Sequence, residues 1–97
     1  MGLKDAVHAK LALEVGELGP VRAAFLTFDV GSQRRMHFWT LLDSHDEPTE
    51  RRIVRIESEI EHQFADDVDF AFTTIHLRGR DPRPLIPQDA LLVKAPA

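Results

Sequence analysis

The sequence contains no cysteine. Disulfide bonds, a thiolate nucleophile and zinc or iron–sulfur sites built on cysteine are therefore excluded. Any metal site in this chain has to use histidine, aspartate or glutamate side chains. The absence of cysteine does not by itself indicate a redox compartment.

Long apolar runs are also missing. No uncharged stretch approaches the roughly 20 residues that a transmembrane helix needs, so we expect no membrane partner. The N-terminus, MGLKDAVHAK, contains neither a continuous apolar segment nor a small-residue cleavage site after one. We therefore expect a cytoplasmic protein.

The sequence motifs of common catalytic sites are absent. There is no G-x-S-x-G elbow, no phosphate-binding loop and no dinucleotide fingerprint. The carboxylate pairs Asp66/Asp67 and Glu59/Glu61 fall in a predicted turn and on an exposed helical face, where nothing favours general acid catalysis. We predict that the protein is not an enzyme and needs no cofactor.

A broadly basic surface is missing as well, since the formal net charge is −4. Residues 46–67 carry eight acids against three arginines, whereas residues 78–97 have four basic residues against two acids. The two parts of the chain therefore have opposite sign. Binding to a phosphate backbone is normally driven by a basic surface, so we expect no nucleic-acid partner.

What is present is the composition of an ordinary globular domain, with 43% hydrophobic and 29% charged residues. A chain of 97 residues fits one domain, and it buries only about 60 to 70% of its unfolded surface. We predict a single α+β domain over residues 1–97.

The clearest predicted element is a helix from about residue 47 to residue 65. Asp46 is suited to be its N-cap, and Pro48 lies in the first turn, where a missing N–H is harmless. Apolar residues then recur at the spacing that faces one side of a helix towards a core. These residues are Ile53, Ile56, Ile60 and Phe64.

Strand-forming residues dominate residues 21–30 and 34–43, and the intervening Gly-Ser-Gln favours a hairpin turn. Residues 69–77, DFAFTTIHL, predict a further strand after the helix. Residues 1–19 are ambiguous between helix and strand, although we favour a helix from Leu3 to about Glu14.

The C-terminal residues 78–97 form a proline-rich arm in which Asp89–Lys94 can add a short edge strand. Together these elements predict an antiparallel three- to four-stranded sheet with helices on one face. The order (α)ββαβ is that of a ferredoxin-like module.

Bulky apolar residues occupy both alternation phases of the predicted strands, so both faces of the sheet should be apolar. Helices on one face cannot cover both. Either the proline-rich arm crosses the second face, or two copies pack their sheets together. We favour a homodimer that also binds a protein partner or small ligand. The predicted contact residues are Phe38, Trp39, Phe70 and Phe72.

The stretch DFAFTTIHLRGRDPRP, residues 69–84, ends in a histidine followed by arginines. His76, Arg78 and Arg80 could hold an anion, with Gly79 allowing close approach of the backbone. The alternative is a plain strand exit whose arginines pair with the acidic border of the helix, which consists of Glu50, Glu57 and Glu61.

A weak divalent-metal or anion-binding regulatory domain is the alternative function. Its metal ligands would be His37 and His76, if their strands are neighbours. The acidic stretch DSHDE at residues 43–47 lacks the spacing and central glycine of an EF-hand loop, so we interpret it as a loop ending in an N-cap.

From Gly19 to Pro82 the chain runs through a strand, a Gly-Ser turn, a strand, a charged helix, an aspartate-rich turn, a strand ending in Thr-Ile-His and then Asp-Pro. This order resembles the cytoplasmic C-terminal domain of cation diffusion facilitators. The resemblance implies a ferredoxin-like or αββαβ module that dimerises and, in some members, binds zinc through histidines. His76 stands where that family has its strand-end histidine, whereas Thr40, Ile53 and Val54 stand where further histidines would be expected.

Overall fold

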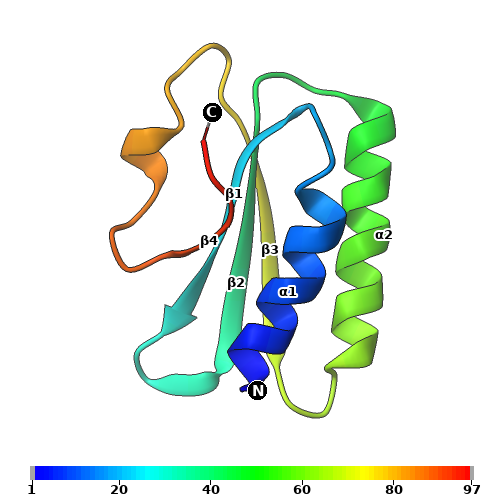
Figure 1. The fold of residues 1–97 in the computed structure, drawn as a ribbon, viewed down its shortest axis with the longest axis vertical. Coiled ribbons are helices and arrows are strands. Elements are labelled where there is room, and N and C mark those ends of the chain that lie inside the picture. The colour runs from blue at the N-terminus through cyan, green and yellow to red at the C-terminus, as the bar shows by residue number, and fades with distance from the viewer. Residues whose placement is uncertain (1, 97) are drawn as a thin grey trace.

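The computed structural model describes residues 2–96, and Figure 1 shows how its helices and strands are arranged. Within this range the chain forms a small α+β domain with the element order α-β-β-α-β-β. The bounds are α1 Leu3–Val15, β1 Val21–Asp29, β2 Ser32–Leu42, α2 Glu47–Gln63, β3 Asp69–His76, the 3-10 helix η1 Arg83–Leu85 and β4 Leu91–Lys94.

The first helix follows from the spacing of its apolar residues. Val7, Leu11 and Val15 recur every four residues, and all three are fully buried. The predicted helix is therefore confirmed. The strand alternative for residues 11–15 is wrong, because the buried positions repeat with the period of a helix.

The second helix begins where the capping signal predicted. The Asp46 side chain accepts a hydrogen bond from the Thr49 backbone N–H at 3.4 Å, and Pro48 occupies the first turn. The helix ends at Gln63, two residues earlier than expected, because Phe64 leaves the helical conformation. Ile53, Ile56 and Ile60 are buried, as the apolar stripe predicted.

The predicted hairpin of β1 and β2 is also confirmed. The two strands are antiparallel, with Phe25 opposite Trp39 at their centre. On its other side β1 pairs with β4, again antiparallel. The C-terminal edge strand is therefore confirmed as well.

The prediction of a wholly antiparallel, ferredoxin-like sheet is wrong. The sheet is mixed and has the order β3-β2-β1-β4, because β3 runs parallel to β2. A 17-residue helix spans about 25 Å, which is close to the length of an eight-residue strand. Helix α2 thus returns the chain to the starting end of β2, from which β3 runs in the same direction.

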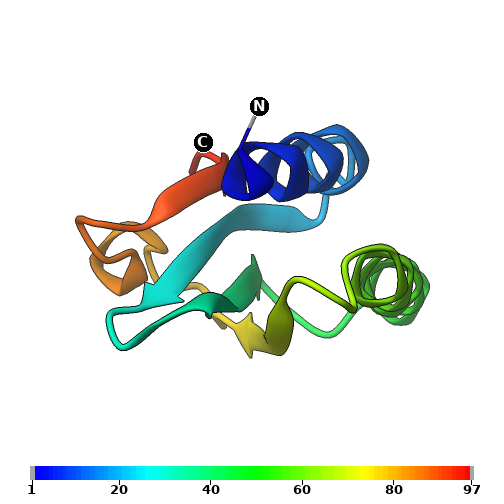
Figure 2. The same cartoon turned by 90° about the horizontal axis from the view of Figure 1, so that it is seen from below.

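Both helices cover one face of the sheet, which we call the helix face, as Figure 2 shows. The main core lies between them and the sheet. Its large, fully buried members include Leu11, Leu26, Phe38, Leu42, Ile53 and Ile60.

The opposite face of the sheet, the far face, is covered in part by the C-terminal arm. Phe25 and Leu41 are buried there with Leu77, and Ile86 and Ala90 of the arm pack against them. Figure 2 shows the part of the arm before β4, drawn in orange, on the side of the sheet away from the helices, whereas β4 itself lies in the sheet beside α1. Two arrangements were expected to cover this apolar face, and the structure shows the one in which the arm packs on it. The need to cover this face is therefore no longer an argument for a homodimer.

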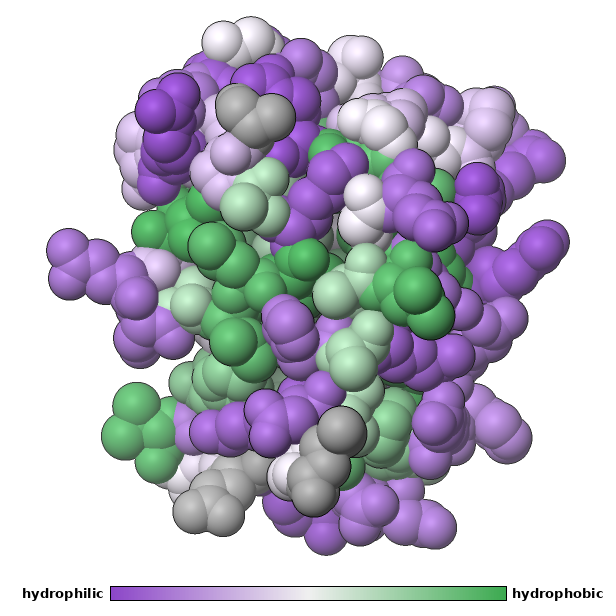
Figure 3. Space-filling view, in the orientation of Figure 1, coloured by the Kyte–Doolittle hydropathy of each residue, from purple (hydrophilic) through white to green (hydrophobic). Residues whose placement is uncertain are grey.

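The exposed surface is mixed in character. Leu13 of α1 and Leu92 of β4 are exposed, and Figure 3 shows apolar surface over these two elements among hydrophilic patches. No helix within residues 2–96 is both long enough and apolar enough to cross a membrane.

Candidate functional site

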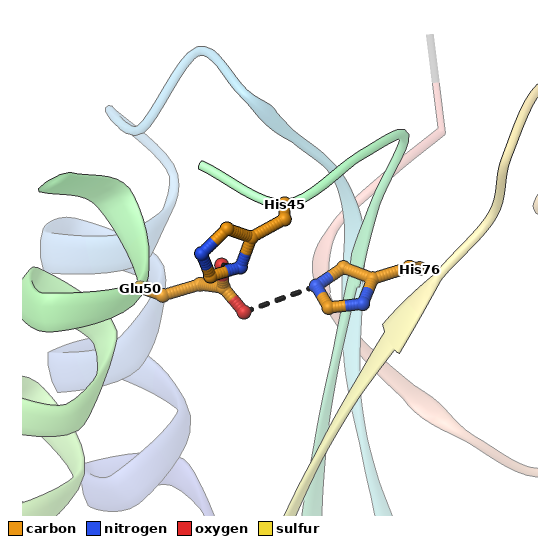
Figure 4. A group of neighbouring side chains, drawn as sticks. All are labelled: His45, Glu50 and His76. Carbon is orange, nitrogen blue, oxygen red and sulfur yellow. Dashed lines mark hydrogen bonds and ion pairs between the residues drawn. The ribbon is translucent and has the colours of Figure 1, made fainter. Parts of the chain in front are cut away.

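Three side chains with metal-binding or acid–base chemistry meet at the carboxyl ends of β2 and β3. They are His45, Glu50 and His76, shown in Figure 4. Each offers one nitrogen or oxygen atom, and these three atoms lie within 4.8 Å of one another. The group joins three segments: the loop before α2, the first turns of α2 and the end of β3.

The start of α2 explains why His45 and Glu50 meet. With Asp46 as N-cap, His45 is the residue before the cap and Glu50 is the fourth residue of the helix. A hydrophobic staple places apolar residues at these two positions, where their side chains touch across the helix start. Here the same geometry joins an imidazole to a carboxylate.

The parallel pairing of β3 explains why His76 joins them. His76 is opposite Leu42, the last residue of β2. The pairing continues past the strand ends, since the Leu77 and Arg78 N–H groups donate to the Leu42 and Asp43 carbonyl oxygens at 2.6 and 2.7 Å. An antiparallel β3 would have put His76 at the other end of β2.

The two imidazoles hold one carboxylate oxygen each. His45 Nδ1 lies 2.5 Å from Glu50 Oε2, and His76 Nε2 lies 3.0 Å from Glu50 Oε1. The two rings stand nearly perpendicular, with their centroids 5.9 Å apart. His45 Nδ1 and His76 Nε2 therefore both point at the Glu50 carboxylate (Figure 4).

The Glu50 carboxylate is held in its charged form. Partial burial acts to raise the pKa of Glu50, but the His76 hydrogen bond, the Asp46 backbone N–H and the two imidazoles together lower it below its ordinary value. The Asp46 N–H donates to Glu50 Oε2 at 3.1 Å, which also orients the side chain. The site thus has a preformed anionic centre.

The group is open to solvent on one side. The His45 side chain is 70% exposed, against 32% for His76 and 22% for Glu50. A surface hollow of about 290 Å³ lies beside it and is also lined by Arg51 and Val54. A small ion can therefore reach the carboxylate directly from water.

The arginines predicted to accompany His76 form no hydrogen bond with its ring within residues 2–96. The Arg80 guanidinium folds back and donates to the backbone carbonyl oxygens of Leu77 and His76 at 2.8 and 3.2 Å. Arg78 and Gly79 turn the chain with φ of 54° and 84°. Neither Arg78 nor Arg80 forms an ion pair with the helix border within residues 2–96.

The predicted metal pair of His37 and His76 is wrong, although their strands are neighbours. His37 shares the far face with Trp39, on which it stacks at a centroid distance of 3.9 Å, and its Nε2 contacts Thr73 Oγ1 at 2.7 Å. His76 is opposite Leu42, which belongs to the helix-face core. Five residues along β2 separate the two registers, or roughly 16 Å, so the rings cannot share an ion.

The predicted contact residues do not form one surface. Phe38 is fully buried in the helix-face core. Phe70 and Phe72 stack on each other at 5.6 Å and pack against that same core. Trp39 points to the far face, so only it could serve a contact there, and the contact itself stays a prediction.

The loop at residues 43–47 serves mainly as a connection, as we expected. Arg22 Nη1 donates to both carboxylate oxygens of Asp43 at 2.9 Å, and Asp46 caps α2. Only His45 of this loop joins the site. Glu50 was missed because it reads as part of the acidic border of α2, although its position four residues after the N-cap was a usable signal.

No protein-family model matches the sequence, and a search of the curated proteins finds no match either. The resemblance to the cation diffusion facilitator domain therefore rests on element order. In the structure the elements from α1 to β3 follow the order α-β-β-α-β that the resemblance implies.

Proposed function

We propose that the protein is a small non-enzymatic module that binds a divalent metal ion through His45, Glu50 and His76. The observation that carries the proposal is the convergence of two imidazole nitrogens on one ionised carboxylate, with all three ligand atoms within 4.8 Å. The ligands are a different set from the pair that the sequence indicated.

The donor set favours zinc among the common divalent ions. Two histidines and one glutamate suit zinc and its late transition-metal neighbours, whereas calcium and magnesium prefer oxygen ligands alone. In zinc sites the ligand atoms lie about 2.0 to 2.2 Å from the metal. Because His45 is largely exposed, its ring can turn to meet the ion at little cost in packing.

A metal bound here would act as a cross-link. It would tie the end of β3 to the start of α2, two segments that are 26 residues apart in the sequence. Three protein ligands also leave a coordination position for water or for a ligand atom from another molecule. The site lies on open surface that does not exclude water, which favours binding rather than catalysis.

Zinc binding should raise the melting temperature, because a ligand bound only by the folded state stabilises it. With a Kd of about 10 µM, 1 mM zinc chloride would add about 2.7 kcal/mol, which is about 10 to 20 °C for a domain of this size. Differential scanning fluorimetry and isothermal titration calorimetry measure the shift and the stoichiometry, which we expect to be one ion per chain.

The substitution His76→Gln should abolish the zinc effect, and Glu50→Gln should reduce it at least tenfold in affinity. The matched control is His62→Gln, because His62 is exposed on α2 and lies away from the site. If wild type shows no shift at 1 mM zinc, or if His62→Gln lowers the affinity as much as His76→Gln, the proposed site is wrong.

A further inference from the structure

Strand β3 is a long edge strand, and within residues 2–96 no further strand pairs with its outer side. It pairs on one side with β2, and it is the last strand of the sheet in Figure 2. Apart from the ladder to β2, the one hydrogen bond to a β3 backbone atom within residues 2–96 runs from Arg80 to the His76 carbonyl oxygen. Its outer backbone groups therefore remain available to a further strand.

The usual protections of an edge are missing from β3 but present on β4. Strand β3 has no proline, no charged residue between Phe70 and Ile75, and no register shift in its eight residues. Strand β4, the opposite edge, has only four residues, one register shift and Lys94. Only one edge of this sheet is thus suited to pairing with another strand.

Opposite charges flank β3 at its two ends. Asp66, Asp67 and Asp69 lie at its start, and Arg78 and Arg80 follow its end. All five side chains are exposed, and none forms an ion pair with another side chain within residues 2–96. The strand therefore has an acidic end and a basic end.

We propose that β3 pairs in antiparallel orientation with β3 of a second copy of this chain, which would join the two sheets into one. Antiparallel pairing places the acidic end of each strand beside the basic end of the other, so the favourable contact occurs twice. Parallel pairing would place acids against acids. A second copy is the occupant because a single sequence carries both halves of this complementary pattern.

A twofold axis at Thr73 gives a register that agrees with the side chains. On the far face Ala71 is opposite Ile75, and on the helix face Phe72 is opposite Thr74, so a larger residue meets a smaller one in each pair. Asp66 and Arg80 lie in the turns just beyond the two ends of β3, so this register brings the acidic turn of each copy near the basic turn of the other. His76 is the last residue of β3 and also a ligand of the proposed metal site, so self-association is measured without added metal.

Sedimentation velocity between 1 and 200 µM tests the dimer. We expect wild type to dimerise within this range and Ala71→Lys, at an exposed position of β3, to raise the Kd of dimerisation about tenfold or more. Ser58→Lys on the exposed face of α2 is the matched control, and circular dichroism shows that each variant is folded. A monomer at 200 µM, or equal Kd values for the two lysine variants, overturns the proposal.

Charge reversal tests the orientation. The variants Arg78→Glu/Arg80→Glu and Asp66→Lys/Asp67→Lys should each dimerise about tenfold more weakly than wild type, because each then has like charges at both ends of β3. Mixed together, they should form a heterodimer as tight as the wild-type dimer. Failure of the two variants to pair with each other excludes the antiparallel arrangement.

Discussion

At the residue scale, Glu57 is a carboxyl group in an unfavourable environment. It lies partly buried on α2, and its Oε2 has no hydrogen-bond partner within residues 2–96. Burial, with repulsion from Glu61, raises the pKa of Glu57 to about 7. The folded chain therefore binds this proton more tightly than the unfolded chain, whose carboxyl has the ordinary pKa of 4.5.

This difference predicts a pH-dependent effect of Glu57→Gln. As the pH rises from about 4.5 to 7, the unfolded chain loses the proton first, so the wild-type free energy of unfolding falls and then levels off. Allowing for screening by solvent, the loss is about 1 to 2 kcal/mol. Glu57→Gln should thus stabilise the protein by that amount at pH 8 and hardly at pH 4, as measured by urea denaturation. Glu59→Gln, at an exposed position, should show no such pH dependence.

At the element scale, the start of α2 supports both the helix and the candidate site. Asp46 accepts from the Thr49 N–H with its side chain, while its own backbone N–H donates to Glu50. The loop before α2 is thereby fixed to the first turns of the helix. This also fixes the position of His45, because His45 directly precedes the N-cap.

Replacing the cap should weaken the helix without removing the Glu50 contact to the backbone. We expect Asp46→Ala to lower the free energy of unfolding by about 1 kcal/mol, whereas Asp46→Asn should change it by only a few tenths. Urea denaturation followed by circular dichroism compares the two. Equal losses in both variants would show that the charge of Asp46, rather than its capping hydrogen bond, stabilises the helix.

At the scale of the whole molecule, the C-terminal arm holds the far face of the sheet. Leu77 is fully buried between the sheet and the arm, next to Phe25 and Leu41. Without the arm these side chains would face water. The arm therefore contributes to the apolar cluster on the far face and also supplies β4.

Truncating Leu77 should lower the free energy of unfolding about as much as truncating a residue of the main core. We expect Leu77→Ala to lower the free energy of unfolding by about 2 to 4 kcal/mol. The control Leu85→Ala, at an exposed position of the arm, should cost less than about 0.5 kcal/mol. If both variants lose the same amount in chemical denaturation, the arm does not depend on Leu77 for its packing.

Local sequence patterns predicted only part of the candidate site. The sequence drew attention to His76 because it ends a strand, and to the N-cap that positions His45. It paired His76 with His37, which the structure places on the other face of the sheet and five residues away in register, because strand neighbours do not reveal which face or which end each side chain occupies. Glu50 looked like any other acid on the outer border of a helix.

The sequence by itself determined both helices, the hairpin, the later strands and the buried stripe of α2, because apolar spacing and capping residues act over a few neighbouring positions. Only the tertiary structure decided that β3 runs parallel to β2 and that the arm covers the far face. These features depend on contacts between segments far apart in the chain. The meeting of His45, Glu50 and His76 depends on that parallel pairing, since it brings the end of β3 to the start of α2.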